Sequence, residues 1–245
     1  LPCKPPDQLS SYGDDALQFG ELRLPAGTGP HPVAAVIHGG CWLSKYASAR
    51  YTGALCDALR DAGIATWHIE YRCVDQPGGG WPGTFTDVAR AIDHLRTLTH
   101  NLDLERVITI GHSAGGTLAL WAAARHRLSA DSPLYSRQPL GLRGVLVLGG
   151  PGDLSAFAER DEGVCGQAVV SMLVGGTPDA APERYRQASA IELLPLGVRQ
   201  ILLTGEHDEA VPPALGDAYA AAAAQAGDDA RHEVVANIAH HEYCA

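Results

Sequence analysis

The sequence lacks several features that would place it in other classes of protein. No apolar run reaches roughly eighteen residues, so no transmembrane helix is predicted. Its six cysteines never stand in a C-x-x-C pair, so neither a zinc site nor a disulfide-rich scaffold is expected. Positive charge is also scarce, because 18 Lys and Arg residues stand against 28 Asp and Glu residues, for a net charge of −10. That charge argues against nucleic acid or an anionic membrane surface as a partner.

The chain length fits one α/β domain. Such folds often run past roughly 200 residues as a single unit, and this chain has 245. We expect one domain over residues 1–245, with a polar, proline-containing N-terminal arm at 1–16. Residues 153–190 are richer in Gly, Pro and charge, and form a candidate lid or substrate-binding insertion. The chain starts at Leu1 rather than Met, which a removed signal peptide would explain, so the localisation stays open, with export the favoured alternative.

Strand-like and helix-like segments alternate along the chain. Short apolar or alternating runs predict strands at 17–24 (an early edge strand), 33–37, 64–71, 107–111, 144–148, 200–204 and 232–235. Apolar residues at helical spacing, with glycine stops, predict helices at 48–62, 84–98, 114–127 and 213–226. This alternation indicates right-handed βαβ crossovers and a mostly parallel twisted sheet with helices on both faces.

The stretch Gly-His-Ser-Ala-Gly at 111–115 joins a β-branched strand to an Ala/Leu-rich helix. It fits the G-x-S-x-G strand–turn–helix elbow, in which a strained turn lifts a serine hydroxyl clear of the sheet. A side chain at either flanking glycine would collide with the neighbouring strand or helix. We therefore predict that Ser113 is a nucleophile. The backbone N–H of Ala114, at the start of the helix, is a candidate donor to an oxyanion.

A serine nucleophile needs an acid that orients its base, and the acid is expected just beyond a late strand. Asp208 occupies that place. Glu206 and Glu209 are nearby competitors that read as parts of a solvated turn. Asp153, which follows the preceding strand, is a further candidate for the acid.

The base is expected after the last strand, where the chain carries the adjacent pair His240 and His241. Only one of the two can face the serine. A pair of histidines can also suggest a metal site, but no third ligand at a sensible spacing lies nearby, so no metal is predicted.

A second oxyanion donor should come from the loop after an early strand. The sequence His-Gly-Gly-Cys-Trp at 38–42 follows a buried strand, and its glycines allow the backbone to turn N–H groups toward a substrate. The candidate donors are the N–H groups of Gly40 or Cys41, together with Ala114. Trp42 is a candidate pocket wall, with packing as the alternative.

Two further residues are candidates for the substrate pocket. His112 directly precedes the serine, and Trp81 follows the glycine run 78–80. That run lacks the Lys-Ser/Thr of a phosphate-binding loop, so we expect it to shape the wall of the site.

The cysteines leave their pairing open. Cys41 and Cys73 follow strands that would be neighbours, so a disulfide between them is one candidate. Cys165 and Cys244 form a weaker candidate pair, for which two free thiols are the preferred expectation.

Together these motifs resemble the α/β-hydrolase superfamily, and more closely its small single-domain esterases of the feruloyl-esterase-like and kynurenine-formamidase-like group. The resemblance spans about residues 18–243 and is carried by H-G-G-x-W at 38–42 and G-H-S-A-G-G at 111–116. Glu-Tyr-Arg at 70–72 resembles the group's structural Tyr-Arg after its fourth strand. Ala-His-His-Glu at 239–242 resembles its usual Gly-His-Phe-Asp/Glu, which is why we prefer His240 over His241 as the base.

The chain also departs from this group. Ala239 stands where the group usually has Gly. Related chains continue after the histidine into a C-terminal helix, whereas this one ends five residues after His240. One sheet face is therefore expected to be partly exposed, which a trimmed chain would explain.

The resemblance and the candidate residues predict a serine hydrolase that cleaves carboxylic esters of small substrates through an acyl-enzyme, with Ser113, Asp208 and His240 as the triad. Arylformamidase or other amidase activity is the alternative, because H-G-G-x-W serves both reactions. A non-catalytic binding protein on this fold would typically lack a triad residue, and here a candidate exists for each. No cofactor is needed, and the oligomeric state stays open.

Overall fold

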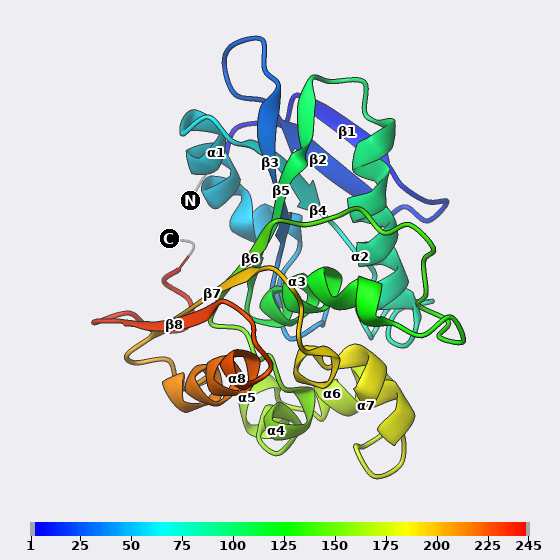
Figure 1. Ribbon diagram of the computed structural model, residues 1–245, viewed down its shortest axis with the longest axis vertical. Helices are drawn as coiled ribbons and strands as arrows, with labels where there is room; N and C mark the ends of the chain where they lie inside the picture. The colour runs from blue at the N-terminus through cyan, green and yellow to red at the C-terminus, as the bar shows by residue number, and fades with distance from the viewer. Residues whose placement is uncertain (1–2, 244–245) are drawn as a thin grey trace.

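An eight-stranded sheet in the order β1-β2-β4-β3-β5-β6-β7-β8 runs through the molecule (Figure 1). The computed structural model describes residues 3–243. The strands are β1 (Gln8–Ser11), β2 (Phe19–Arg23), β3 (His31–Ile37), β4 (Ala65–Ile69), β5 (Leu102–His112), β6 (Gly144–Leu148), β7 (Arg199–Gly205) and β8 (Ala230–Val235). The β1–β2 and β2–β4 pairs are antiparallel and the remaining pairs are parallel, which confirms the mostly parallel sheet.

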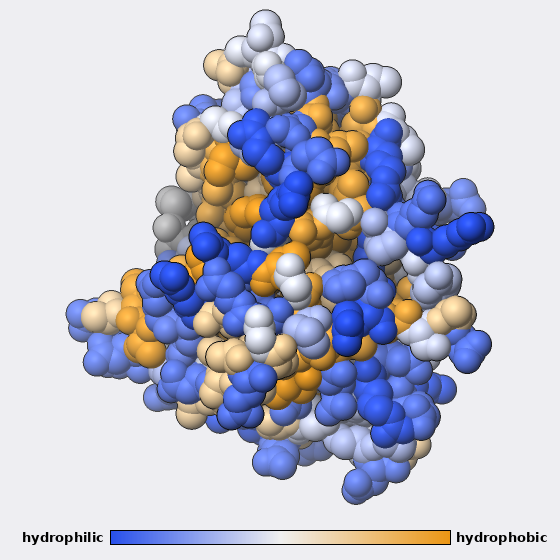
Figure 2. Space-filling model, viewed as in Figure 1, coloured by the Kyte–Doolittle hydropathy of each residue, from blue (hydrophilic) through white to orange (hydrophobic). Residues whose placement is uncertain are grey.

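Helices connect the parallel strands and cover both faces of the sheet. The longer ones are α1 (Gly53–Asp61), α2 (Gly83–His94), α3 (Ala114–Ala124) and α8 (Pro213–Gln225). Short 3-10 turns extend the helical regions at η1 (Ala49–Thr52), η2 (Leu95–Thr97), η3 (Arg125–Arg127) and η4 (Ala190–Leu193). Among residues 3–243, no helix is long and apolar enough to span a bilayer. On the face seen in Figure 2, hydrophilic residues are the more extensive, and hydrophobic residues show between them, mainly across the middle of the view.

Alternation along β3 divides the core into two layers. Val33, Ala35 and Ile37 pack in the larger core, with residues of α2 and α3. Ala34 and Val36 point to the opposite face, where they meet α1. A central parallel strand buried on both faces needs this continuous apolar run, because successive side chains point to opposite sides.

Two expectations for the N-terminal region are wrong. The predicted arm at 1–16 contains β1, which pairs with β2, so β1 and not the 17–24 segment is the edge strand. The sequence of β1 is Gln-Leu-Ser-Ser, and even its Leu9 is 63% exposed. An edge strand that buries so little apolar surface carries no hydrophobic signal in the sequence.

The insertion (residues 153–190) is more ordered than its composition suggests. It folds into four short helices, α4 (Leu154–Ala158), α5 (Asp161–Cys165), α6 (Val169–Val174) and α7 (Pro182–Ala188), which gather beside α8 below the sheet (Figure 1). Their buried side chains join the larger core. The helices are too short for periodicity to identify them, and packing rather than propensity stabilises them.

The expected exposed sheet face is found at β8. On the face that carries α1, this strand presents the exposed charged residues Arg231 and Glu233. Toward β6 and β7 the same face is covered by Tyr243, which packs with Leu148 and Leu203. The uncovered portion is therefore polar and suits contact with water.

The chain passes from β5 into α3 through a very close backbone approach. A Cβ added at Gly111 would lie 2.1 Å from the carbonyl oxygen of Gly115. A Cβ added at Gly115 would lie 2.2 Å from the carbonyl oxygen of Ile37 on β3. Glycine at these positions is required for α3 to start directly against the sheet, as the motif predicts.

We therefore predict that Gly115→Ala lowers the free energy of unfolding by about 3 kcal/mol, because backbone atoms of β3 must move to admit the methyl group. Gly141→Ala is the matched control, since a Cβ there meets no atom within 4 Å. The control should stay within about 0.5 kcal/mol of the parent in chemical denaturation. Equal stability of the two variants would contradict the close-packed elbow.

Candidate active site

Ser113 occupies the turn between β5 and α3 with φ 51° and ψ −122°. Positive φ is uncommon for a residue with a side chain and persists where the surroundings hold it. Here the Ser113 N–H donates to the carbonyl oxygen of Leu148 on β6 at 2.9 Å, and α3 begins at the next residue. The side chain is thereby raised above the carboxyl ends of the central strands.

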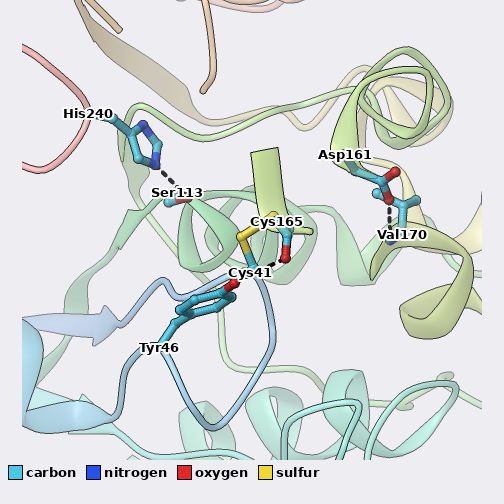
Figure 3. Close-up of a disulfide and its surroundings, with 7 residues drawn as sticks. All are labelled: Cys41, Tyr46, Ser113, Asp161, Cys165, Val170 and His240. Atoms are coloured by element: carbon cyan, nitrogen blue, oxygen red, sulfur yellow. Dashed lines mark hydrogen bonds between the residues drawn. A yellow bond between two sulfur atoms is a disulfide. The ribbon is translucent and has the colours of Figure 1, made fainter. Parts of the chain in front are cut away.

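A histidine and a carboxylate line up behind the serine hydroxyl. Ser113 Oγ donates to His240 Nε2 at 2.9 Å, a contact drawn in Figure 3. His240 Nδ1 in turn donates to Asp208 Oδ2 at 2.8 Å. The structure thus brings together the three residues that the sequence analysis selected as the triad.

The buried carboxylate of Asp208 follows β7 and accepts two further hydrogen bonds besides the one from His240. Val211 N–H donates to Oδ1 at 2.8 Å and the Tyr243 hydroxyl donates to Oδ2 at 2.9 Å. Burial alone would raise the pKa of Asp208, but the hydrogen bonds from His240, Val211 and Tyr243 outweigh it and lower the pKa. The carboxylate therefore stays ionised and orients the imidazole.

The other acidic residues that the sequence offered for the triad make contacts elsewhere or are exposed. Asp153 caps α4, where its side chain accepts from Ser155 N–H at 2.9 Å and Ala156 N–H at 3.2 Å. Glu206 accepts from a backbone N–H at 3.1 Å, and Glu209 is exposed. Neither reaches the imidazole.

Of the two adjacent histidines, His240 faces the serine. The ring of His241 packs edge-on against the ring of His240, with 5.2 Å between the ring centroids. Within residues 3–243, no three His, Cys, Asp or Glu side chains converge as metal ligands would.

The turn that carries His240 is anchored by residues beside the triad. His112 Nε2 donates to the carbonyl oxygen of His240 at 2.9 Å. Tyr243 links the turn to β7, because its hydroxyl accepts from Gly205 N–H and donates to Asp208. Burial, followed by repulsion from His240, lowers the pKa of His112 to about 4. His112 is therefore neutral near pH 7 and acts as a fixed donor.

A second imidazole–carboxylate pair supports the β3 loop (residues 38–47). His38 is fully buried and donates through Nε2 to Glu70 Oε1 at 2.8 Å, while its ring stacks on Tyr71. Burial would raise the pKa of Glu70, but hydrogen bonds from His38 and from the N–H groups of Ala49 and Tyr71 lower it overall. The Glu70 carboxylate thus joins the end of β4 to the start of the β3 loop and to η1, which follows the loop.

The β3 loop presents two backbone donors beside the serine. Gly40 and Cys41 have φ of 100° and 54°, and both line the cavity that contains Ser113. Within the described chain, no acceptor pairs with the N–H of Gly40, Cys41 or Ala114. Backbone N–H groups that have no acceptor and lie beside a nucleophile are the donors that an oxyanion site requires.

The cavity has a volume of about 230 Å³ and contains His112, as expected. Sequence reasoning missed several of its walls, because neither spacing nor composition indicates that these segments meet. They come from the β3 loop, η1, α5 and the loop after β7: Tyr46, Ala47, Tyr51, Val164 and Ala210.

The two tryptophans expected at the pocket lie elsewhere. Trp42 is 1% exposed, and its ring packs edge-on against Phe157 of α4. Trp81 packs against Phe85 of α2, and the glycine run 78–80 before it does not line the cavity. Trp42 gains more by burial in the core, and the partly buried Trp81 gains more by packing against that core, than either would by exposure in the small cavity.

The disulfide expectations are also wrong. Cys41 is bonded to Cys165 of α5, at a Cα–Cα distance of 5.9 Å (Figure 3). Cys73 is a buried free thiol, and Cys244 lies outside the described residues. Strand adjacency favoured Cys73, but the folding of α5 over the β3 loop brings Cys165 closer.

A nucleophile elbow at the carboxyl end of a central parallel strand, with a carboxylate after β7 and a histidine after β8, defines the α/β-hydrolase class of folds. The BD-FAE family model matches residues 21–222, and the chain belongs to this family of α/β-hydrolase esterases.

Two curated relatives illustrate the range of this similarity. Kynurenine formamidase of Meyerozyma guilliermondii is 34% identical over 114 residues, which cover 46% of this chain and 41% of the relative. A probable isoprenylcysteine alpha-carbonyl methylesterase of Oryza sativa subsp. japonica is 24% identical over 233 residues, covering 90% of this chain and 54% of the relative. The chain thus spans about half the length of these relatives.

Solved structures share the fold at low identity. A truncated form of a carbohydrate esterase from gut microbiota has a TM-score of 0.80 at 20% identity, with 98% of this chain and 93% of that chain covered. The esterase Est2 of Thermogutta terrifontis, solved with propionate bound, has a TM-score of 0.73 at 19% identity, with 95% and 84% covered. These likenesses show the α/β-hydrolase fold.

The buried His112 predicts a specific loss of stability in acid. Its folded-state pKa of about 4 lies below its ordinary value of 6.5, so between these pH values the unfolded chain binds a proton that the folded chain does not. The stability that neutral His112 contributes is complete above about pH 6.5 and is lost as the pH falls toward 4. The loss amounts to about 3 kcal/mol.

His112→Gln is the test variant, because its amide can donate to the His240 carbonyl but cannot titrate. Chemical denaturation from pH 7 to pH 4 should give a shallower loss for the variant than for the parent. Parallel profiles would show that His112 does not titrate in this window.

Proposed function

We propose that the chain is a serine hydrolase that cleaves small carboxylic esters with a short, uncharged acyl group. The observation that carries this proposal is the hydrogen-bonded series Ser113, His240 and Asp208 at a small cavity, beside backbone N–H groups without partners. Membership in an esterase family agrees with it.

In the proposed acylation step, Ser113 Oγ attacks the ester carbonyl carbon while His240 Nε2 takes the hydroxyl proton. The negative charge that develops on the carbonyl oxygen is stabilised by the N–H groups of Gly40 or Cys41 and of Ala114. Asp208 holds the imidazole through Nδ1 and stabilises its charged form. His240 then gives its proton to the leaving alcohol, and the acyl group remains on Ser113.

Deacylation uses the same groups with water in place of the alcohol. His240 removes a proton from water, the resulting oxygen attacks the acyl carbon, and Ser113 Oγ regains the proton as the acid leaves. The neutral His240, which donates to Asp208 and accepts from Ser113, is the form that this cycle needs at its start.

The cavity supports the substrate class. Its volume of about 230 Å³ is below the roughly 300–1,000 Å³ of sites for drug-sized ligands, which favours short acyl groups. Among the residues that line it in the described chain, none is Asp, Glu, Lys or Arg. A charged acyl group would therefore lose its hydration without gaining a partner.

An N-formyl amide is the second candidate substrate class. The kynurenine formamidase relative favours it, although the alignment covers less than half of this chain. A formyl group is the smallest acyl group and fits a small cavity. The same triad and donors would serve the reaction, with an amine as the leaving group.

An oxidising location is also proposed, in line with the expectation of export. The Cys41–Cys165 disulfide supports it, because such bonds persist outside the reducing cytosol.

The proposal predicts the effect of removing the nucleophile or the base. Ser113→Ala should lower kcat for a short p-nitrophenyl ester by on the order of 10⁶-fold, because the covalent step is lost. His240→Ala should have a comparable effect, whereas His241→Ala should keep most of the activity. Purified variants are compared with the parent in a spectrophotometric assay.

Retention of the parent rate within tenfold by Ser113→Ala would rule out this serine as the nucleophile. A larger loss in His241→Ala than in His240→Ala would reverse the choice of base. Running N-formylkynurenine beside the ester then distinguishes the substrate classes, and the higher kcat/KM identifies the preferred one.

A further inference from the structure

The disulfide joins two segments that both contribute to the wall of the active-site cavity. Cys41 belongs to the β3 loop and Cys165 ends α5 of the insertion, 124 residues later. Figure 3 shows the bond beside Ser113 and His240. Both Cys41 and Val164, the neighbour of Cys165, line the cavity. A cross-link in this place fixes the β3 loop and α5 relative to each other at the cavity wall.

Two further contacts connect the same segments. The Tyr46 hydroxyl donates to the carbonyl oxygen of Cys165 at 3.2 Å (Figure 3). The Trp42 ring packs edge-on against Phe157 of α4 with 6.4 Å between centroids. The disulfide is thus the covalent member of a group of contacts between the β3 loop and the insertion.

The β3 loop has a backbone that needs such support. Three consecutive residues, Gly40, Cys41 and Trp42, have φ of 100°, 54° and 55°. Left-handed conformations at residues with a side chain are unfavourable and persist only where neighbouring structure imposes them. The N–H groups of Gly40 and Cys41 are the proposed oxyanion donors, so whatever holds this conformation also places the donors.

The position of α5 in the cavity wall likewise depends on contacts that hold the two ends of this helix. The helix has five residues, which is too short to be stable by itself. Its start is held by the buried Asp161, whose Oδ2 accepts from Val170 N–H at 2.7 Å. Its other end is held by Cys165. Val164 lies next to that end, so the position of this wall residue depends on the disulfide.

We propose that the Cys41–Cys165 disulfide is a positioning cross-link that sets the oxyanion donors and the α5 wall relative to Ser113. This inference rests on the proposed function. With the bond intact, the enzyme turns over short acyl esters at its full rate and excludes longer ones. With the bond broken, the oxyanion donors lose their alignment, and Val164 can move so that the cavity admits longer acyl groups.

Breaking the bond requires a reductant, for which a dithiol is the chemical class. One thiolate of the dithiol attacks one sulfur of the bond and forms a mixed disulfide. The second dithiol sulfur then displaces the enzyme sulfur and closes the oxidised reagent. Cys41 and Cys165 gain two electrons and two protons in total, and the dithiol loses the same number.

The experiment compares the oxidised enzyme, the same enzyme reduced with dithiothreitol, and the variant Cys165→Ser. Intact mass verifies reduction by the gain of two hydrogen atoms. We expect kcat for a p-nitrophenyl acetate substrate to fall by about 10–100-fold with KM changed less than about threefold, because oxyanion contacts act mainly in the transition state. Activity on the octanoate relative to the acetate should rise by roughly fivefold as the wall yields.

Cys73→Ser is the matched control, since Cys73 is a buried free thiol outside the cavity. Burial raises the pKa of this thiol to about 12, so it does not compete in exchange near neutral pH. The control should keep the oxidised kinetics and lose activity on reduction as the parent does. Dithiothreitol should leave Cys165→Ser unchanged.

Near-ultraviolet circular dichroism at the assay temperature checks folding, and reoxidation should restore kcat. A reduced enzyme that is folded and keeps its kcat and acyl preference would overturn the proposal. Unfolding of both the reduced parent and Cys165→Ser would also overturn it, because the bond would then support the whole fold. If the oxidised parent hydrolyses neither ester nor formamide, the proposed function itself fails, and the inference falls with it.

Discussion

The active site depends on a steric constraint at Ser113, where the chain turns from β5 into α3 with a positive φ. The turn is held because α3 starts in direct contact with the sheet, with Gly115 against the carbonyl oxygens of Ile37 and His38. One consequence is that the serine hydroxyl stands at the carboxyl end of the strands. Another is that the first N–H of the helix lacks an internal partner, and so is free to act on a substrate.

Two imidazole–carboxylate pairs lie beside this turn, and the same electrostatic effects act on both. Asp208 holds His240 on one side, and Glu70 holds His38 on the other. In both, burial opposes ionisation of the acid, and several donors restore it. The first pair orients the proposed base, and the second supports the loop that carries the proposed oxyanion donors. Fixed donors and acceptors of this kind need no rearrangement during reaction.

The insertion completes the site from a distance in sequence. Its helices add apolar side chains to the main core, while α5 alone reaches the cavity, through Val164. The disulfide and the Tyr46 hydroxyl bring this helix onto the β3 loop. A small active-site cavity therefore forms in a single sheet-based unit, with walls from segments that lie far apart in the chain.

The sequence by itself determined the mostly parallel sheet and the elbow that carries Ser113, because local patterns encode them. The place of Asp208 after a late strand made it the preferred acid, and the resemblance to the esterase group made His240 the preferred base over His241. Apolar runs specify buried strands, and the glycines around the serine reflect a clash that any side chain would cause. The tertiary structure alone decided the edge strand β1, the packing of Trp42 and Trp81 away from the cavity, and the pairing of Cys41 with Cys165. These depend on contacts between segments far apart in the chain, where packing overrides what composition and spacing can indicate.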